Sequence, residues 1–228
     1  MSGRVPTGCQ ALDALLGGGV ERGTVTEVFG EGGSGKSNIV LVLAANVARA
    51  GKKAIIIDTE GISLERLFQV AGGPKDREAA ERLMRAIFIF DASDLDEQEE
   101  AVNKAIVLAE QREDVDFVAL DSATSHYRRY VGTDEEVRAR QRLGLMVTRL
   151  LRCARMRKIP VVITNQVYTD IEAGRDEPIG GHHLGHSSKA IVRLERAGRG
   201  RRRATIEKHR SIGEGASAEF TLTTDGLE

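Results

Sequence analysis

The sequence is organised around one glycine-rich stretch, Gly30-Glu31-Gly32-Gly33-Ser34-Gly35-Lys36-Ser37. This stretch fits the phosphate-binding loop G-x-x-x-x-G-K-[ST] at every fixed position. Residues 25–29 before it are β-branched and aromatic, as in a strand, and residues 37–50 after it form an apolar helical run that Gly51 stops. In this context, backbone amides and the positive end of the helix dipole can bind phosphate. The stretch therefore predicts a nucleoside-triphosphate site.

Individual side chains of this site have expected roles. Lys36 is expected to reach the β- and γ-phosphates, and the Ser37 hydroxyl to bind Mg²⁺. Asp121 ends the apolar run 115–120 and is expected to hold Ser37 or a water on Mg²⁺, although an aspartate there could also cap a helix. The predicted nucleotide contacts of the loop and the following helix start are Gly30, Glu31, Gly32, Gly33, Ser34, Gly35, Lys36, Ser37 and Asn38.

Composition narrows the class of protein. The 228 residues carry a net charge of −1 and include two cysteines, Cys9 and Cys153, without metal-like neighbours. No signal peptide opens the sequence and the apolar runs are strand-sized, so we expect a soluble, cytoplasmic protein without a membrane span. The small net charge gives no overall field that would attract DNA, so DNA contacts would come from local basic patches. The absence of Trp and the aromatic content of 4% argue against a platform on which bases stack.

The order of apolar runs predicts an α/β fold. We expect strands at 25–29, 53–58, 86–91, 115–122 and 160–166, with those at 53–58 and 86–91 buried. Helices are expected at 37–50, 63–71, 76–85, 94–112 and 134–158. Thr7 is expected to cap a short helix in the lead-in 1–24, and Asp94 to cap the helix 94–112. Arginines on the helix 134–158 are expected to form a solvated face.

The remaining segments complete the predicted architecture. Residues 125–133 and 167–188 are expected to be loops, the second without secondary structure of its own. Apolar and polar residues alternate in 189–195 and in 203–210, on either side of the tip 198–202. This pattern predicts an antiparallel hairpin, and a last strand is expected at 218–223. We therefore expect a single domain over 1–228, a mainly parallel sheet flanked by helices with antiparallel strands at its C-terminal side (189–223).

Polar motifs that follow the phosphate loop resemble the ATPase core of the RecA/RadA strand-exchange recombinases. These motifs are Asp58-Thr59-Glu60-Gly61, Asp121-Ser122, Thr164-Asn165-Gln166-Val167 and Ile179-Gly180-Gly181, with the lead-in Pro6-Thr7-Gly8, Leu12-Asp13 and Leu15–Gly19. The resemblance covers nearly the whole chain, and a stand-alone core of this size is similar to the archaeal recombinase paralogues. It implies a RecA-like P-loop NTPase core that uses ATP and Mg²⁺ in DNA repair and homologous recombination.

The resemblance also implies roles for single residues at the nucleotide. Glu60 would polarise the attacking water, with a helix-capping acid as the alternative. Gln166 would sense the γ-phosphate, so the implied catalytic residues are Glu60, Gln166 and Lys36. Arg66 would stack on adenine.

Two segments correspond to the recombinase DNA-binding loops, 125–133 and 167–188. Arg128 and Arg129 in the first are expected to contact DNA phosphates. Both segments contain or adjoin acids, which oppose a DNA backbone: Asp134, Glu135, Glu136, Asp170, Glu172, Asp176 and Glu177. We therefore expect weak DNA binding there, or DNA binding shifted to the hairpin tip at Arg199, Arg201, Arg202 and Arg203.

Two further clusters have open interpretations. Lys208 and Arg210 resemble the finger pair that DnaB-type helicases and KaiC insert into a neighbour's ATP site, although a solvated strand end explains them equally well. His182, His183 and His186 lack a nearby cysteine, so a zinc site is less favoured than a role linked to nucleotide or DNA.

These observations favour an ATP-binding accessory factor of recombination that binds single-stranded or branched DNA and hydrolyses ATP slowly or not at all. No linker with a Phe-x-x-Ala docking segment and no helical DNA-binding domain precede the core, so we expect no filament formation by that docking. The resemblance implies a recombinase and a Holliday-junction resolvase as partners, and it is compatible with a homo-oligomer. The alternatives are an active strand-exchange recombinase and a KaiC-like oligomeric signalling ATPase.

Overall fold

A mixed β-sheet forms the centre of the computed structural model, which describes residues 3–170, 175–180, 184 and 187–228. Its strands are β3 (Val25–Gly30), β4 (Lys53–Asp58), β5 (Ile87–Asp91), β6 (Val115–Asp121), β7 (Val161–Asn165), β10 (Ala190–Arg196), β11 (Arg201–His209), β12 (Ser217–Thr223) and β13 (Gly226–Leu227). The spatial order is β13-β12-β11-β10-β3-β7-β6-β4-β5. From β5 to β10 neighbouring strands are parallel, and from β10 to β13 they are antiparallel. This confirms the predicted sheet.

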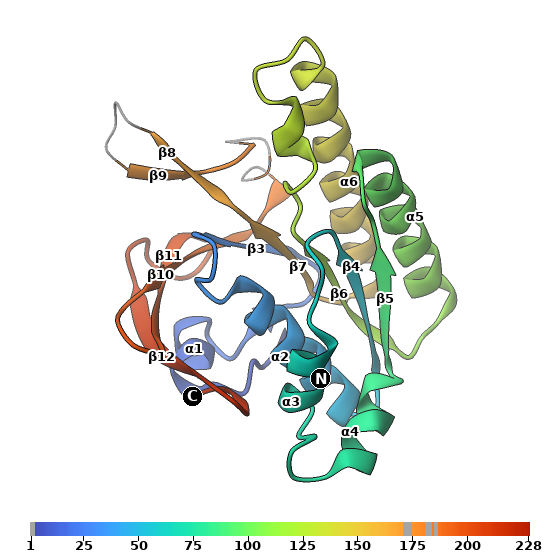
Figure 1. Ribbon diagram of the computed structural model, residues 1–228, viewed down its shortest axis with the longest axis vertical. Helices are drawn as coiled ribbons and strands as arrows, with labels where there is room; N and C mark the ends of the chain where they lie inside the picture. The colour runs from blue at the N-terminus through green and yellow to red at the C-terminus, as the bar shows by residue number, and fades with distance from the viewer. Residues whose placement is uncertain (1–2, 171–174, 181–183, 185–186) are drawn as a thin grey trace.

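Helices cover both faces of the sheet (Figure 1). One face carries α1 (Gln10–Leu15), α2 (Lys36–Arg49), α3 (Leu64–Val70) and α4 (Arg77–Met84), and the other carries α5 (Leu95–Gln111) and α6 (Glu136–Arg157). Each face has its own hydrophobic cluster because the strands between them are apolar on both sides.

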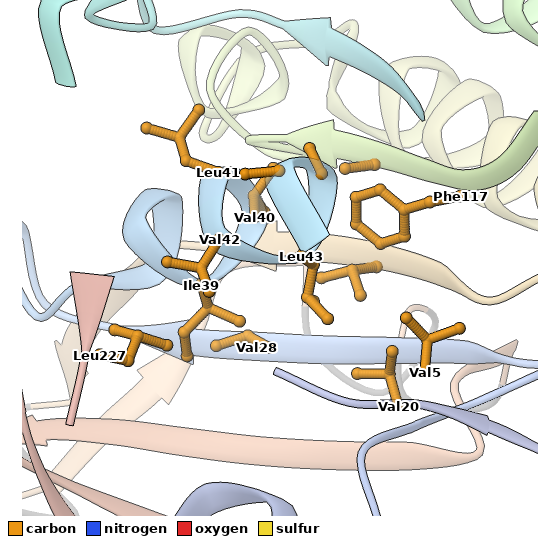
Figure 2. Close-up of a cluster of buried hydrophobic side chains, with 14 of the residues drawn as sticks. Val5, Val20, Val28, Ile39, Val40, Leu41, Val42, Leu43, Phe117 and Leu227 are labelled. Carbon is orange, nitrogen blue, oxygen red and sulfur yellow. The ribbon is translucent and has the colours of Figure 1, made fainter. Parts of the chain in front are cut away.

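The larger part of the first cluster surrounds α2, the helix that follows the phosphate loop. Figure 2 shows Val40 and Leu43 of α2 among buried side chains of the sheet. Residues from both ends of the chain, Val5, Val20 and Leu227, lie in the same cluster. The helix that presents the loop is therefore packed on several sides and is held rigidly.

The lead-in helix begins differently from the prediction. Cys9 is the N-cap residue of α1 and no side chain caps the helix, so the prediction that Thr7 caps it is wrong. The Asp13 carboxylate accepts hydrogen bonds from the Thr7 amide and hydroxyl, both at 2.7 Å. Asp13 thereby organises the turn ahead of its own helix. The same lead-in contributes a short pair, β1 (Arg4–Val5) with β2 (Val20–Glu21), that sequence reasoning missed.

Three other segments also differ from the sequence predictions. The run 86–91 is only half-buried, because β5 pairs with β4 alone and forms the sheet edge. Residues Tyr127–Tyr130 form a 3₁₀ turn, η1, inside the predicted first loop. The segment after β7 contains an antiparallel pair, β8 (Val167–Asp170) with β9 (Arg175–Pro178), so the absence of secondary structure predicted there is wrong.

The arginine-rich face of α6 is only partly solvated. Arg142 forms ion pairs with Asp96 (2.6 Å) and Glu99 (3.0 Å) of α5, and Arg149 also contacts Glu99 at 3.1 Å. Part of the predicted solvent face is thus used to join two helices. None of the helices in the described part of the chain has the length and apolar content needed to cross a membrane.

Strand register brings distant polar residues to one edge of the sheet. Asp58 at the end of β4 is opposite Asp121 of β6, and Phe29 of β3 is opposite Asn165 of β7. The phosphate loop starts at the same edge, where parallel strands of open α/β sheets end and ligands bind.

Candidate nucleotide-binding site

The phosphate loop connects β3 to α2 through glycines in backbone conformations that other residues rarely adopt. Gly33 has φ +73° and Gly35, the N-cap of α2, has φ +108°. The first backbone bond of α2 runs from the Ile39 amide to the Gly35 carbonyl at 3.2 Å, so the preceding amides remain available at the helix N-terminus. The Ser34 hydroxyl is buried without a partner among the described residues. A loop of this form suits a phosphate group.

Lys36 is folded onto its own loop. Its Nζ donates to the carbonyls of Gly30 (2.7 Å) and Glu31 (2.8 Å). Burial lowers the pKa of the Lys36 ammonium, while the carboxylates of Glu60 and Asp121 act in the opposite direction. A phosphate would restore a full counter-charge to this buried cation.

Asp121 lies at the buried end of β6, with 1% of its surface exposed. Burial raises the pKa of the Asp121 carboxyl, and hydrogen bonds from Thr164 and Ser37 partly offset this effect. Ser37 and Asp121 thus meet, as predicted from their places in the sequence. Hydroxyl and carboxylate oxygens are the hard ligands that Mg²⁺ prefers, with phosphate oxygens and water completing its shell.

Glu60 lies on a turn that Asp58 organises. The Asp58 carboxylate accepts hydrogen bonds from the amides of Glu60 (3.0 Å), Gly61 (2.9 Å) and Ile62 (2.5 Å). Sequence reasoning included Asp58 in one motif with Glu60 and did not foresee this role. The carboxylate is directed at its own turn and positions Glu60.

Gln166 joins the Glu60 turn to the candidate first DNA loop. Its Nε2 donates to the Glu60 carboxylate, and its Oε1 accepts from Arg128 Nη1 at 2.7 Å. Both functional atoms of the Gln166 side chain are therefore engaged by residues that sequence reasoning assigned to different tasks. We call Arg128, Gln166 and Glu60 the polar relay.

Arg66 lies beside the nucleotide loop but is anchored by protein groups. Its Nε donates to Asn38 Oδ1 at 2.7 Å, and its Nη atoms donate to the carbonyls of Thr223 (2.7 Å) and Thr224 (2.8 Å). The guanidinium thus links the start of α2 to the end of β12, and adenine stacking stays a prediction.

One cleft collects several of the predicted residues. It is lined by Ser37, Asn38, Leu41, Glu60, Gly61, Ile62, Ser63, Arg66 and Asp121. Residues predicted from four separate segments therefore share one opening beside the phosphate loop.

The candidate DNA residues are distributed differently. Arg128 and Arg129 are both exposed, although Arg128 is bonded to Gln166. At the hairpin tip, Arg203 forms an ion pair with Glu219 at 2.7 Å, and Arg201 lies 3.8 Å from the same carboxylate. Arg202 donates to the Gly33 carbonyl of the phosphate loop at 3.1 Å. Within the described residues, only Arg199 of these four hairpin arginines is without such a contact.

The remaining predicted clusters gain little support. Arg210 forms an ion pair with Glu21 of the same chain, at the sheet edge opposite the phosphate loop. The finger role of Lys208 and Arg210 stays a prediction. His182, His183 and His186 lie outside the described residues. Among the residues that are described, no group of three or more His, Cys, Asp or Glu side chains could hold a metal ion.

Sequence reasoning missed a buried polar network beneath the site. Asn165 Nδ2 donates to Glu27 Oε1 and to the Ile179 carbonyl, both at 2.9 Å, and Asn165 Oδ1 accepts from Thr124 Oγ1 at 2.6 Å. Ser188 also donates to Glu27, at 3.3 Å. The signal available was a glutamate among the β-branched and aromatic residues of the strand before the loop, where a buried carboxyl needs a hydrogen-bond partner.

Comparison with known proteins gives consistent matches over nearly the whole chain. The family model described as Rad51 matches residues 3–228. The DNA repair and recombination protein RadB of Methanococcoides burtonii is 47% identical over 220 residues, which cover 96% of this chain and 95% of that protein. The RadB of Halobacterium salinarum is 42% identical over 228 residues, covering 98% and 94%. A solved structure described as the RadB recombinase aligns with a TM-score of 0.82 and 33% identity, covering 98% of both chains.

Proposed function

Because this chain belongs to the Rad51 family and, within it, to the RadB proteins of DNA repair and recombination, we propose that it is an ATP-binding accessory factor of homologous recombination. In this proposal it binds ATP with Mg²⁺, contacts DNA, and uses ATP mainly as a conformational switch. Hydrolysis is slow, and filaments do not form by the docking that strand-exchange recombinases use.

The observation that carries the ATP proposal is the shared cleft beside the phosphate loop. Ser37 and Asp121 supply oxygens for Mg²⁺, while Glu60 lines the same opening. Glu60 is the residue that would orient the attacking water, and Lys36 would neutralise phosphate charge.

The polar relay supports a switch more than a fast hydrolase. The Glu60 carboxylate is bonded to Gln166, which in turn is bonded to Arg128. Before Glu60 can orient water, this arrangement must change. A γ-phosphate that attracts the Gln166 amide would release Glu60 and Arg128 together, and Arg128 lies on an exposed turn where DNA could reach it. ATP binding would thereby alter the candidate DNA surface.

An accessory role is preferred over active strand exchange because of charge. Acids adjoin both candidate DNA loops, and beside the first loop Asp134 and Glu135 are exposed. Such carboxylates repel a DNA backbone and weaken the electrostatic part of its binding. Long helical filaments on DNA with ATP, seen by electron microscopy, would instead support the strand-exchange alternative.

Nucleotide titration of a lysine variant tests the site. Lys36→Ala removes the only cation of the loop and should abolish measurable ATP binding, because the buried phosphates then lose the ammonium that offsets their charge. Lys104→Ala is the matched control, since Lys104 is exposed on α5 and pairs with Glu100. Equal ATP affinity in the two variants would contradict the proposal. Calorimetric titration with Mg·ATP measures both.

A further inference from the structure

Two arginines of the β10–β11 hairpin contact the phosphate loop from outside its cradle. Arg196, the last residue of β10, donates from Nη2 to the Gly32 carbonyl at 2.7 Å. Arg202, near the start of β11, donates from Nη2 to the Gly33 carbonyl at 3.1 Å. These contacts link residues more than 160 positions apart in the sequence.

The two contacts fix the orientation of peptide groups in the phosphate loop. In a planar trans peptide, the carbonyl of one residue and the amide of the next point in opposite directions. A guanidinium that holds the Gly32 carbonyl outward therefore turns the Gly33 amide toward the inside of the loop. The second contact fixes the next peptide, whose Ser34 amide closes a turn onto the Glu31 carbonyl at 3.1 Å.

The loop needs external support because it is unusually rich in glycine. Four of its residues, Gly30, Gly32, Gly33 and Gly35, lack a side chain that would restrict the backbone, and ordering glycine costs more entropy than ordering other residues. Gly33 also makes room for the contact, since a Cβ there would lie 2.5 Å from Arg196 Nη2. The loop and the hairpin thus fit each other.

Arg202 retains a donor that the protein itself does not use. Its Nε is buried without a hydrogen-bond partner in the described part of the chain. The same atom lies 3.7 Å from the position of a Cβ on Gly35, the residue that caps α2. The Arg202 side chain is therefore packed against the N-terminus of α2 as well as bonded to the loop.

Strand alternation singles out Arg202 from its neighbours. Side chains on a strand alternate between the two faces of the sheet, so Arg201 and Arg203 share one face and Arg202 points to the other. Arg201 and Arg203 both approach Glu219 of β12. Arg201 is therefore a control in the same hairpin, with the same charge and no contact with the loop.

We propose that Arg196 and Arg202 are positioning residues that clamp the phosphate loop in its binding conformation. The C-terminal hairpin thereby sets the affinity for nucleoside di- and triphosphates. This inference rests on the proposed ATP binding and assigns Arg202 to the nucleotide site, in place of the DNA contact expected from the sequence. The expected selectivity is for nucleotides with a β-phosphate, because the amides of a phosphate loop would surround that group.

Nucleotide affinities of Arg196→Gln, Arg202→Gln and Arg201→Gln test the clamp. Each clamp variant should weaken binding of ATP and of ADP about tenfold, the value of roughly one hydrogen bond, and should leave AMP binding nearly unchanged. Arg201→Gln should match the wild type for all three nucleotides. Arg202→Lys should recover part of the loss, because an ammonium can still donate to the Gly33 carbonyl. Urea unfolding of each variant shows that the fold is retained.

The binding measurements distinguish a failure of the clamp from a failure of the proposed ATP binding. Wild-type ATP binding that Lys36→Ala abolishes, together with unchanged affinity in both clamp variants, would overturn the clamp and leave the proposed function standing. Equal losses for AMP and ADP, or an equal loss in Arg201→Gln, would also overturn it. Absence of ATP binding in the wild type would overturn the proposed function and the clamp with it.

Discussion

The buried carboxyl of Glu27 offers a sharp test of how the sheet supports this site. Glu27 lies on β3 with 2% of its surface exposed, and it accepts hydrogen bonds from Asn165 at 2.9 Å and Ser188 at 3.3 Å. Asn165 directly precedes Gln166 of the polar relay. Two substitutions separate the hydrogen bonds from the charge: Glu27→Gln keeps the shape and removes the charge, whereas Glu27→Ala removes both.

The difference between these two variants follows from the contacts. Glutamine can still accept from Asn165, and its amide can donate to the Ser188 hydroxyl, which itself donates to the Leu184 carbonyl at 3.1 Å. Alanine leaves a buried donor of Asn165 unpaired, which costs about 1–3 kcal/mol, and removes one buried methylene, about 0.8 kcal/mol. We therefore expect Glu27→Ala to be less stable than Glu27→Gln by about 2–4 kcal/mol at every pH.

The difference between wild type and Glu27→Gln should depend on pH. Burial raises the pKa of the Glu27 carboxyl, and the bonds from Asn165 and Ser188 and the charge of Lys208 only partly offset this. The folded chain thus holds the proton more tightly than the unfolded chain does. The carboxyl is fully stabilising below the ordinary glutamate pKa, and this contribution is lost as pH rises through the raised folded value. Glu27→Gln should consequently gain stability relative to wild type as pH rises.

Urea unfolding of the three proteins between about pH 4 and pH 8 measures both effects. Other titrating groups, including Asp121, are common to all three proteins and cancel in the comparison. If Glu27→Gln were as unstable as Glu27→Ala, the hydrogen-bond argument would fail. If the gap between wild type and Glu27→Gln did not change with pH, the argument from the buried charge would fail.

Two further predictions concern the polar relay. Glu60→Gln should lower the rate of ATP hydrolysis about 100-fold or more while leaving ATP affinity within a few-fold, because a general base contributes to the chemical step; phosphate-release kinetics with undiminished turnover would exclude Glu60 as that base. Arg128→Gln should make nucleotide affinity insensitive to added DNA, because the link from the exposed turn to Gln166 is lost, whereas Arg129→Gln should keep that sensitivity. Both arginine variants should reduce the slope of log DNA affinity against log salt concentration by about one unit. If added DNA changed the nucleotide affinity equally in the two variants, the relay would be refuted.

Local patterns in the sequence were sufficient to predict the elements that form the candidate nucleotide site. The spacing of glycines, Lys36 and Ser37 depends only on neighbours along the chain, and so do the apolar runs that became β3, β4, β6 and β7. Because parallel strands end at one edge, Asp121 could be placed near Ser37 without a structure. The family resemblance was confirmed by matches that cover nearly the whole chain.

Predictions failed where an outcome depended on pairing across the sheet. The segment after β7 looked like a loop because its residues are largely polar, but β8 and β9 pair with each other. The run that forms β5 looked buried because it is apolar, yet it has a strand neighbour on one side only. Thr7 was predicted to cap a helix, but its amide and hydroxyl donate to the Asp13 carboxylate instead.

The hairpin arginines show most clearly what can be predicted from the sequence and what depends on the tertiary structure. The sequence alone was enough to predict a phosphate-binding loop and a basic hairpin, because each motif consists of consecutive residues. Only the folded chain decided that Arg202 faces the phosphate loop while Arg201 and Arg203 face Glu219. That division depends on the register of β11 against its neighbours, and a shift by one residue would exchange the two faces. The contacts that hold the loop are thus set by sheet geometry between residues far apart in the chain.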